Sequence, residues 1–135
     1  MSYLLDTHYI LWSLFEPDRI GKKVKRILVD EEQTKYVSGI SIWEISLKYS
    51  IGKLELIDTN PDEIIEKVKE SGFELLNVEN LVLASYYQLP KKEHHKDPFD
   101  RMLIWQAITN NLTLLSKDTG ISQYVDNGLK IESGK

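Results

Sequence analysis

The sequence predicts an α/β fold: a three-layer α/β/α sandwich with a central, mainly parallel sheet of four to five strands. Short apolar segments alternate along the chain with longer segments of helical periodicity. The connections between successive strands are long enough to cross over the sheet, as parallel pairing requires. With 135 residues and no internal repeat, the chain is expected to form a single domain, residues 1–135.

The predicted strands are short apolar runs that end abruptly at polar residues. They are residues 3–5, 36–38, 73–78, 112–116 and 129–131. Asp6 directly follows the first strand, and Asp118 lies just past the fourth. Because parallel sheets bind ligands beyond the carboxyl ends of their strands, both acids are expected on the same rim.

The predicted helices are marked by apolar residues at helical spacing and by glycine or proline at their ends. They span residues 10–15, 20–32, 40–51, 61–71, 81–89 and 98–110, with one more between the last two strands. Asp18 is expected to cap the second helix. Asp97 followed by Pro98 is typical of an N-cap with proline at the first helical position.

Composition indicates a soluble, cytoplasmic protein. Hydrophobic residues make up 41% of the chain and charged residues 28%, with no run of about 18 apolar residues that would span a membrane. The first residues lack the basic leader of a signal peptide. The absence of cysteine excludes disulfides and thiolate metal sites. The three tryptophans are expected in the core: Trp12, Trp43 and Trp105.

The charge balance argues against a simple nucleic-acid binder, because the formal net charge is −4 and the pI is about 5.4. This conclusion reverses if the acids gather in one metal site and the cations form separate patches. Two groups of cations are candidates: Lys22, Lys23, Lys25 and Arg26, and Lys91, Lys92 and Lys96. Taken singly, each group is also explained as a solvated surface.

Asp100 lies on the apolar face of its predicted helix. At 100° per residue it shares a stripe with Leu103, Ile104 and Ala107. Burying an unpaired carboxylate is costly unless it is neutralised, hydrogen-bonded or bound to a cation. The alternative explanation is a solvated acid that complements the helix dipole.

Glu44 breaks the apolar pattern of another helix in the same way. It lies on a stripe with Ile40, Leu47 and Ile51. A charge on a core face is a local violation of the folding pattern, and such violations are typical of functional sites. The alternative is a Glu44 that is solvated, or that pairs with Lys48 one turn later.

Four acids are therefore candidates for one pocket: Asp6, Glu44, Asp100 and Asp118. Grouped carboxylates raise each other's pKa unless a cation neutralises them. Ligands that offer only oxygen select hard cations, so Mg²⁺ or Mn²⁺ is favoured over zinc. Because magnesium is commonly completed by substrate phosphates, the group indicates phosphoryl chemistry, with either one or two ions.

Four segments in order resemble the PIN-domain proteins of the VapC type, the ribonuclease toxins of bacterial and archaeal toxin–antitoxin pairs. These segments are residues 4–7, 41–45, 95–101 and 114–118. The resemblance covers nearly the whole chain, and the ordered spacing is more specific than any one motif. It implies a PIN-like fold and a Mg²⁺- or Mn²⁺-dependent endoribonuclease that hydrolyses RNA through a metal-activated water.

The resemblance also implies residue roles and partners. Asp6, Glu44, Asp100 and Asp118 would form the catalytic site, with Asp6 and Asp100 as the direct metal ligands. A homodimer and a cognate antitoxin that inserts near the site are implied. The RNA substrate stays open between tRNA, rRNA and mRNA.

Further residues near these motifs are expected to have supporting roles. Thr7 and Ser116 are expected to hydrogen-bond the acids or water. Asp97 is explained by its cap alone, so a catalytic role for it stays an alternative. Arg101 has two equal readings, contact with phosphate or pairing with an acid. His95, in a polar loop with His94, is expected to be solvated and not a metal ligand.

The chain departs from the usual family pattern at His8, where asparagine is frequent, and at Trp105, where a small residue is usual. Neither departure removes an acid.

Two other functions are compatible with the same fold. One is a nuclease without an antitoxin that acts in RNA processing or on structured DNA. The other is a catalytically silent interaction module, which the presence of all four acids disfavours.

Overall fold

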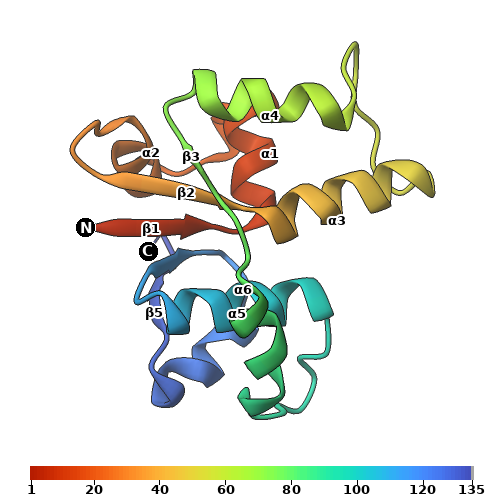
Figure 1. Ribbon diagram of the computed structural model, residues 1–135. Helices are drawn as coiled ribbons and strands as arrows, with labels where there is room; N and C mark the ends of the chain where they lie inside the picture. The colour runs from red at the N-terminus through yellow and green to blue at the C-terminus, as the bar shows by residue number, and fades with distance from the viewer. Residues whose placement is uncertain (135) are drawn as a thin grey trace.

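A five-stranded sheet forms the centre of the computed structural model, which describes residues 1–134 (Figure 1). All of its neighbouring strands pair in parallel, in the order β3-β2-β1-β4-β5. Their bounds are Ser2–Leu5 (β1), Thr34–Ser38 (β2), Glu74–Leu76 (β3), Thr113–Leu115 (β4) and Lys130–Glu132 (β5). The predicted fold class is confirmed, and each predicted strand is present with small shifts at its ends.

Helices fill the connections between these strands. Their bounds are Thr7–Phe15 (α1), Lys22–Val29 (α2), Gly39–Ser50 (α3), Pro61–Glu70 (α4), Asn80–Ser85 (α5) and Pro98–Thr109 (α6). Three segments are 3₁₀-helical: Pro17–Arg19 (η1), Tyr86–Gln88 (η2) and Thr119–Asn127 (η3). Among residues 1–134, no helix has the length and apolar character needed to cross a bilayer.

Two predicted helices differ in detail from the structure. The predicted cap of α2 is wrong: Asp18 lies within η1, and Gly21 is the N-cap of α2. Pro17 explains this difference, because proline favours the first position of a new helical turn. The predicted helix 81–89 divides into α5 and η2, and proline at position 90 follows the second of them.

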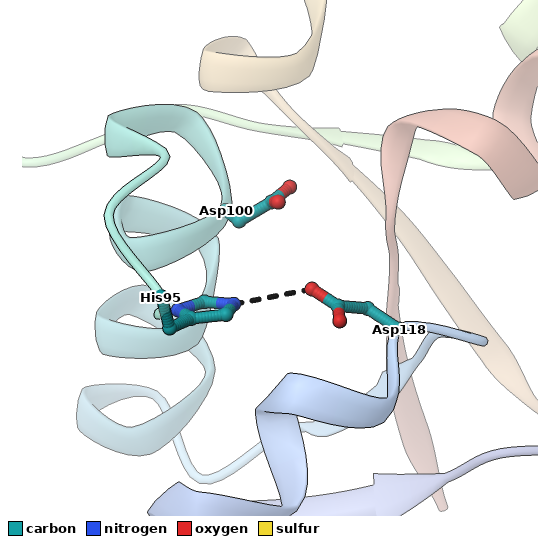
Figure 2. A group of neighbouring side chains, drawn as sticks. All are labelled: His95, Asp100 and Asp118. Atoms are coloured by element: carbon teal, nitrogen blue, oxygen red, sulfur yellow. Dashed lines mark hydrogen bonds and ion pairs between the residues drawn. The ribbon is translucent and has the colours of Figure 1, made fainter. Parts of the chain in front are cut away.

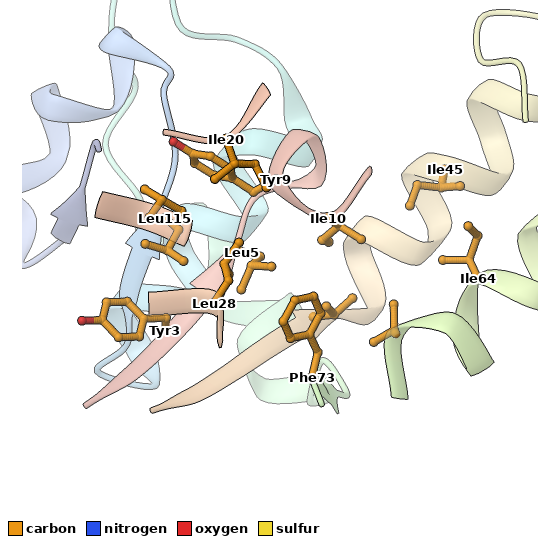
Figure 3. Packing of buried hydrophobic residues seen from close by; sticks show 13 residues of the cluster. Tyr3, Leu5, Tyr9, Ile10, Ile20, Leu28, Ile45, Ile64, Phe73 and Leu115 are labelled. Carbon is orange, nitrogen blue, oxygen red and sulfur yellow. The ribbon is translucent and has the colours of Figure 1, made fainter. Parts of the chain in front are cut away.

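The sheet separates two hydrophobic clusters, as a three-layer sandwich requires. In Figure 1, α1, α2 and α4 lie on one side of the sheet, and α5 and α6 lie on the other. Successive side chains of β1 point to opposite faces of the sheet, so Tyr3 and Leu5 join the first cluster while Leu4 joins the second. Figure 3 shows the first cluster, to which β1 contributes Leu5, α1 contributes Ile10 and α4 contributes Ile64.

The order in which strands are added to the sheet changes side at β1. From β1 the chain passes to β2 on one side, and later returns to β4 on the other side. The carboxyl ends of β1 and β4 are adjacent, since Leu5 pairs with Leu115 and the Asp6 amide donates to the Leu115 carbonyl at 3.0 Å. Such a switch point is where parallel sheets bind ligands.

The prediction of a core position for Trp43 is wrong, because 59% of its surface is exposed. The predicted stripe on α3 is also only partly correct, since Leu47 and Ile51 are exposed. The buried face of α3 instead carries Glu44 and Ile45, which lie about 100° and 200° around the helix from Trp43. The other two tryptophans, in α1 and α6, are half-buried against the two clusters.

Candidate active site

Asp6 connects the end of β1 to the start of α1. Its carboxylate accepts a hydrogen bond from the Tyr9 amide at 3.0 Å, which makes it the N-cap of α1. Burial raises the pKa of Asp6, and hydrogen bonds from the Ser116 side chain and the Tyr9 amide oppose that rise. Asp6 therefore serves as a cap and also presents a carboxylate at the rim of the sheet.

Glu44 is buried in α3, with 5% of its surface exposed. Thr7 Oγ1 donates to one of its carboxylate oxygens at 2.6 Å, and Lys48 binds the other. Thr7 Oγ1 also lies 3.0 Å from Ser41 Oγ; because its single hydrogen goes to Glu44, Ser41 donates in that pair. Glu44 is therefore on the core face and also paired with Lys48, and it is not solvated.

The hydrogen bond to Glu44 raises the pKa of Lys48, although partial burial opposes it. The negative charges of Asp97 and Asp100 raise this pKa further. Lys48 is thus a cation whose charge is stabilised by acids from two different helices.

Asp97 and Asp100 mark the beginning of α6. Asp97 Oδ1 accepts hydrogen bonds from the amides of Phe99 and Asp100, at 2.9 and 3.0 Å, so the predicted N-cap is confirmed. Burial is the largest cause that raises the pKa of Asp100 to about 7. The charges of Asp97, Glu44, Asp118 and Asp6 raise it further, in that order. Asp100 therefore lies where the charges of four other carboxylates converge.

Asp118 caps η3 at the end of the loop that follows β4. Its Oδ1 accepts from the Gly120 amide at 2.8 Å, and its own amide donates to Ser116 Oγ at 3.1 Å. A side chain at Gly120 would not fit, because its Cβ would lie 2.8 Å from Cδ2 of His95. Ser116 contacts both acids of the rim, as expected, through the Asp118 amide and the Asp6 carboxylate.

The prediction that His95 is solvated is wrong, since only 7% of its surface is exposed. Its Nε2 lies 3.1 Å from Asp118 Oδ2, and its Nδ1 lies 3.0 Å from the Tyr124 hydroxyl. A tight turn brings it there: its amide donates to the Lys92 carbonyl, and His94 has a positive φ of 63°. The polar loop therefore folds back onto η3 instead of extending into solvent.

The prediction that Arg101 pairs with an acid is wrong, because it forms no ion pair among the described residues and its guanidinium is engaged inside the protein. Nη1 and Nη2 donate to the carbonyls of Pro90 and Leu89, both at 3.1 Å. Nε and Nη1 donate to the hydroxyls of Tyr86 and Tyr124, both at 2.8 Å. Arg101 thus joins the end of η2 and η3 to α6.

The hydrogen bonds around Tyr124 indicate the tautomer of His95. The Tyr124 hydroxyl accepts from Arg101, so its single proton is free to be donated to His95 Nδ1. His95 then carries its proton on Nε2 and donates it to Asp118. This chain of hydrogen bonds holds the Asp118 carboxylate in one orientation.

Figure 2 shows His95, Asp100 and Asp118 pointing into a common space, with His95 bonded to Asp118. One possible ligand atom from each lies within 4.8 Å of the others. This set differs from the pair expected from the sequence, Asp6 and Asp100, although the charge of Asp6 also acts on Asp100. The charges of several carboxylates act on Asp100, and a divalent cation would offset their mutual repulsion. The group therefore fits a divalent cation.

Sequence reasoning missed His95, Tyr124 and Lys48 as parts of this site. Lys48 had a signal, since it lies one turn after Glu44 and was considered only as an alternative explanation. His95 and Tyr124 are 29 positions apart and meet only through the fold. No local pattern in the sequence indicates that contact.

The family model of the PIN domain matches residues 3–127. Solved structures with a similar fold include a chain of VapBC2 from Rickettsia felis bound to promoter DNA. It is 18% identical, with a TM-score of 0.70, over 98% of both chains. DNA-bound VapBC from Salmonella typhimurium is also 18% identical, with a TM-score of 0.67, over 98% of this chain and 97% of that chain.

FitAcB from Neisseria gonorrhoeae is 24% identical, with a TM-score of 0.65, over 96% of this chain and 95% of that chain. At these identities the likeness concerns the fold. A comparison with curated protein sequences gives no significant match. Because the family model spans nearly the whole length, the chain belongs to the PIN domain family.

Proposed function

We propose that this protein is a Mg²⁺- or Mn²⁺-dependent endoribonuclease of the VapC type, the toxin of a toxin–antitoxin pair that acts in the cytoplasm. The PIN domain is a nuclease fold, and the chain belongs to that family. The structures it resembles include VapBC and FitAB complexes. A nuclease without an antitoxin, or a silent module, has no specific observation in its favour.

One observation carries the proposal: carboxylates from four separate parts of the chain act on Asp100. They come from the end of β1, from α3, from the start of α6 and from the loop after β4. Such a concentration of negative charge raises the free energy of the folded protein unless a cation relieves it. A protein with no use for a cation would gain stability by replacing Asp100 with a neutral residue.

The proposed site uses Asp6 and Asp100 as metal ligands, with Asp118 nearby. A bound Mg²⁺ or Mn²⁺ would polarise the scissile phosphate and lower the pKa of a water molecule that attacks it. His95 fixes the direction of the Asp118 carboxylate. Lys48 lies beside Glu44 and offsets part of the charge that repels a phosphate.

Thr7 and Asp97 support this arrangement from the ends of two helices. Thr7 fixes Glu44 by donating to Oε1, in the first turn of α1. Asp97 aims Asp100 by capping α6 three residues before it. In this proposal both residues position the acids and do not touch the reacting phosphate.

The proposal is tested with the purified chain, separated from any partner, and total RNA. Cleavage is expected with Mg²⁺ or Mn²⁺, no cleavage with EDTA, and full recovery when metal is restored. Mapping the ends of the fragments then identifies the RNA class. RNA cleavage that persists in EDTA would contradict the metal dependence.

An antitoxin is proposed to dock in a hollow of about 530 Å³ beside α1. Apolar side chains of α1 and of the segment after α3 line it, among them Trp12 and Ile57. His8 also lines the hollow, and its charge acts on Asp6, so an inserted segment would end beside the acids. This location explains how a bound antitoxin would block the site.

The antitoxin proposal is tested by co-expression with a candidate antitoxin, such as a small protein encoded by an adjacent gene. Ile57→Asp is expected to abolish the complex and leave RNA cleavage unchanged, because Ile57 is 83% exposed. Ile51→Asp, also at an exposed position but outside the hollow, is the control and should keep the complex. Equal binding by both variants would place the antitoxin elsewhere.

A homodimer is proposed through α3 and α5. Both helices pack against α6, and they carry exposed apolar residues: Trp43 and Leu47 on α3, Leu81 and Leu83 on α5. Exposed apolar residues grouped in this way are typical of interfaces. Sedimentation should show a dimer that Leu81→Asp dissociates; a monomeric parent protein would contradict the proposal.

A further inference from the structure

A hollow of about 440 Å³ lies beside the acidic site, on the other side of the loop that precedes α6. The residues that line it come from η2, from this loop and from the first turns of α6. Lys91, Lys92 and Lys96 supply positive charge, and no carboxylate of residues 1–134 lines it. Glu93, in the same loop, is not among the lining residues. The hollow is thus basic in a protein whose net charge is −4.

The three lysines are available to a ligand. Within the described part of the chain, none of them forms an ion pair. Lys92 lies over the ring of Tyr124, with its Nζ 5.7 Å from the centroid, while Lys91 and Lys96 are exposed. Unpaired lysines collected around a concave surface attract polyanions.

Arg101 forms part of the wall of this hollow and is not the group that holds a ligand. Its four hydrogen bonds to Leu89, Pro90, Tyr86 and Tyr124 occupy most of its donors. They tie the end of η2 to α6 and η3. The hollow therefore has a rigid wall, with flexible ammonium groups along its edge.

The ring of Tyr87 is exposed at the same hollow, with 81% of the residue's surface in contact with solvent. An exposed aromatic ring beside a line of cations is the usual arrangement for single-stranded nucleic acid. The lysines bind phosphates, and the ring stacks on a base of any sequence.

His95 connects the hollow to the acids. It lines the hollow, and its Nε2 lies 3.1 Å from Asp118 Oδ2 in the acidic site. A polynucleotide whose scissile phosphate lies at the acids would pass His95 and enter the hollow. The hollow and the acidic site therefore share His95.

We infer that the hollow between η2 and α6 binds the single-stranded RNA that flanks the scissile phosphate. Lys91, Lys92 and Lys96 contact its phosphates, and Tyr87 stacks on one base. This inference rests on the proposed function, because it assumes that RNA is the substrate. It adds the path that the RNA takes and the residues that hold it.

Binding of a fluorescent single-stranded oligouridine, measured by anisotropy at several salt concentrations, tests the inference. Every protein in the binding assays, the reference included, carries Asp100→Asn and is measured without metal, so that no RNA is cut. Replacing the three lysines of the hollow by glutamine should weaken binding about a hundredfold at roughly 0.1 M salt. The slope of log affinity against log salt should fall in magnitude by about 2, since each single-strand phosphate contact contributes about 0.7.

A matched control comes from the exposed face of α2. Glutamine at Lys22, Lys25 and Arg26 changes the net charge by the same amount at a separate surface. This control should keep the parent affinity within about threefold and the parent salt slope. Equal losses in both triple variants would mean that only net charge matters, and would overturn the inference.

Tyr87 gives a second, uncharged test. Tyr87→Ala should weaken oligouridine binding by about tenfold, and Tyr87→Phe should restore it, because stacking requires the ring and not the hydroxyl. The salt slope should be the same in both variants. Unchanged binding in the alanine variant would overturn the stacking contact.

Cleavage assays separate this inference from the proposed function. In the metal-loaded protein, the lysine variant should raise KM for RNA and leave kcat nearly unchanged. If the parent protein cleaves RNA and the lysine variant has the same KM, the binding path is wrong and the nuclease proposal stands. If the parent cuts no RNA but oligouridine binding still depends on the lysines, the nuclease proposal fails alone. Loss of antitoxin binding with unchanged RNA binding would assign the hollow to the antitoxin instead.

Discussion

Asp100 combines two costs that a folded protein normally avoids, a partly buried carboxylate and several nearby negative charges. Burial is the larger cause of its raised pKa of about 7, followed by the charge of Asp97. An acid whose pKa rises on folding binds a proton more readily in the folded state than in the unfolded state. Its contribution to stability is therefore greatest below the unfolded pKa and is lost as the pH rises toward 7.

Asp100→Asn should stabilise the metal-free protein above about pH 7, and its effect should vanish below about pH 4. The full shift in pKa would correspond to a gain of about 4 kcal/mol in the free energy of unfolding. We expect a gain of about 2 kcal/mol because Asp100 is partly exposed. Urea denaturation in EDTA at several pH values measures the difference. A variant less stable than the parent at pH 8 would contradict this account of Asp100.

Tyr124 is the buried hydroxyl on which His95 and Arg101 both depend. Tyr124→Phe leaves donors of Arg101 and the Nδ1 of His95 without this partner, which should cost about 1–3 kcal/mol. Urea denaturation at neutral pH measures this loss. Tyr87→Phe removes an exposed hydroxyl and should change stability by less than about 0.5 kcal/mol. Equal stability of the two variants would mean that the hydrogen-bonded chain to Asp118 is not as described.

At the scale of an element, the start of α6 determines where Asp100 points. Asp97 caps the helix and Pro98 occupies its first position, so the carboxylate two residues later faces the sheet rim. The local sequence was sufficient to predict this helix start, because caps and proline act within a few residues. It was insufficient for the loop before it, where the burial of His95 depends on η3.

Asp97→Ser should keep the cap and the stability of α6, because a serine hydroxyl accepts the same amide hydrogen bonds. Asp97→Ala should lower the free energy of unfolding by about 1 kcal/mol, because the cap is lost. Both changes remove a charge that acts on Asp100, so its pKa in the metal-free protein should fall below 7. An NMR titration of the carboxyl carbon measures that fall, and RNA cleavage by the serine variant should remain near the parent level.

The control for this experiment is the cap of another helix. Asn60 caps α4 by accepting from the Glu63 amide, and Asn60→Ala should cost a similar free energy without changing the pKa of Asp100. Loss of RNA cleavage in Asp97→Ser, with stability retained, would instead assign Asp97 a direct role in catalysis.

At the scale of the whole molecule, a bound cation would join segments that are far apart in the chain. Its proposed ligands, Asp6 and Asp100, follow β1 and begin α6, and the nearby Asp118 follows β4. A ligand that binds only the folded state stabilises it by about 2.7 kcal/mol at a hundred times its Kd. Mn²⁺ should therefore raise the Tm of the parent and of Asp62→Asn, which changes an exposed acid in the first turn of α4.

The same addition of Mn²⁺ should leave the Tm of Asp100→Asn nearly unchanged. Differential scanning calorimetry with and without EDTA measures these shifts. An equal shift in Asp100→Asn and the parent would mean that the metal binds at another site.

That the charges of Asp6, Glu44 and Asp118 act on Asp100 agrees with the sequence pattern, because strand ends and helical phase are regular. Two residues at the ends of parallel strands must share a rim, and helical periodicity identifies which helix face carries an acid. Trp43 shows where this reasoning fails, since it lies on a face of α3 that the rest of the fold leaves exposed. Arg101 shows the same limit, because its partners are carbonyls and hydroxyls of segments that only the fold brings near.

RNA cleavage by the parent protein, Asp100→Asn and Asp62→Asn, side by side with Mn²⁺, tests the central claim most directly. The parent and Asp62→Asn should cut RNA at the same rate. Asp100→Asn should lose more activity than the roughly 10- to 100-fold typical of changes in groups that only support a metal ligand. Cleavage by folded Asp100→Asn at the parent rate would contradict a carboxylate metal site centred on Asp100.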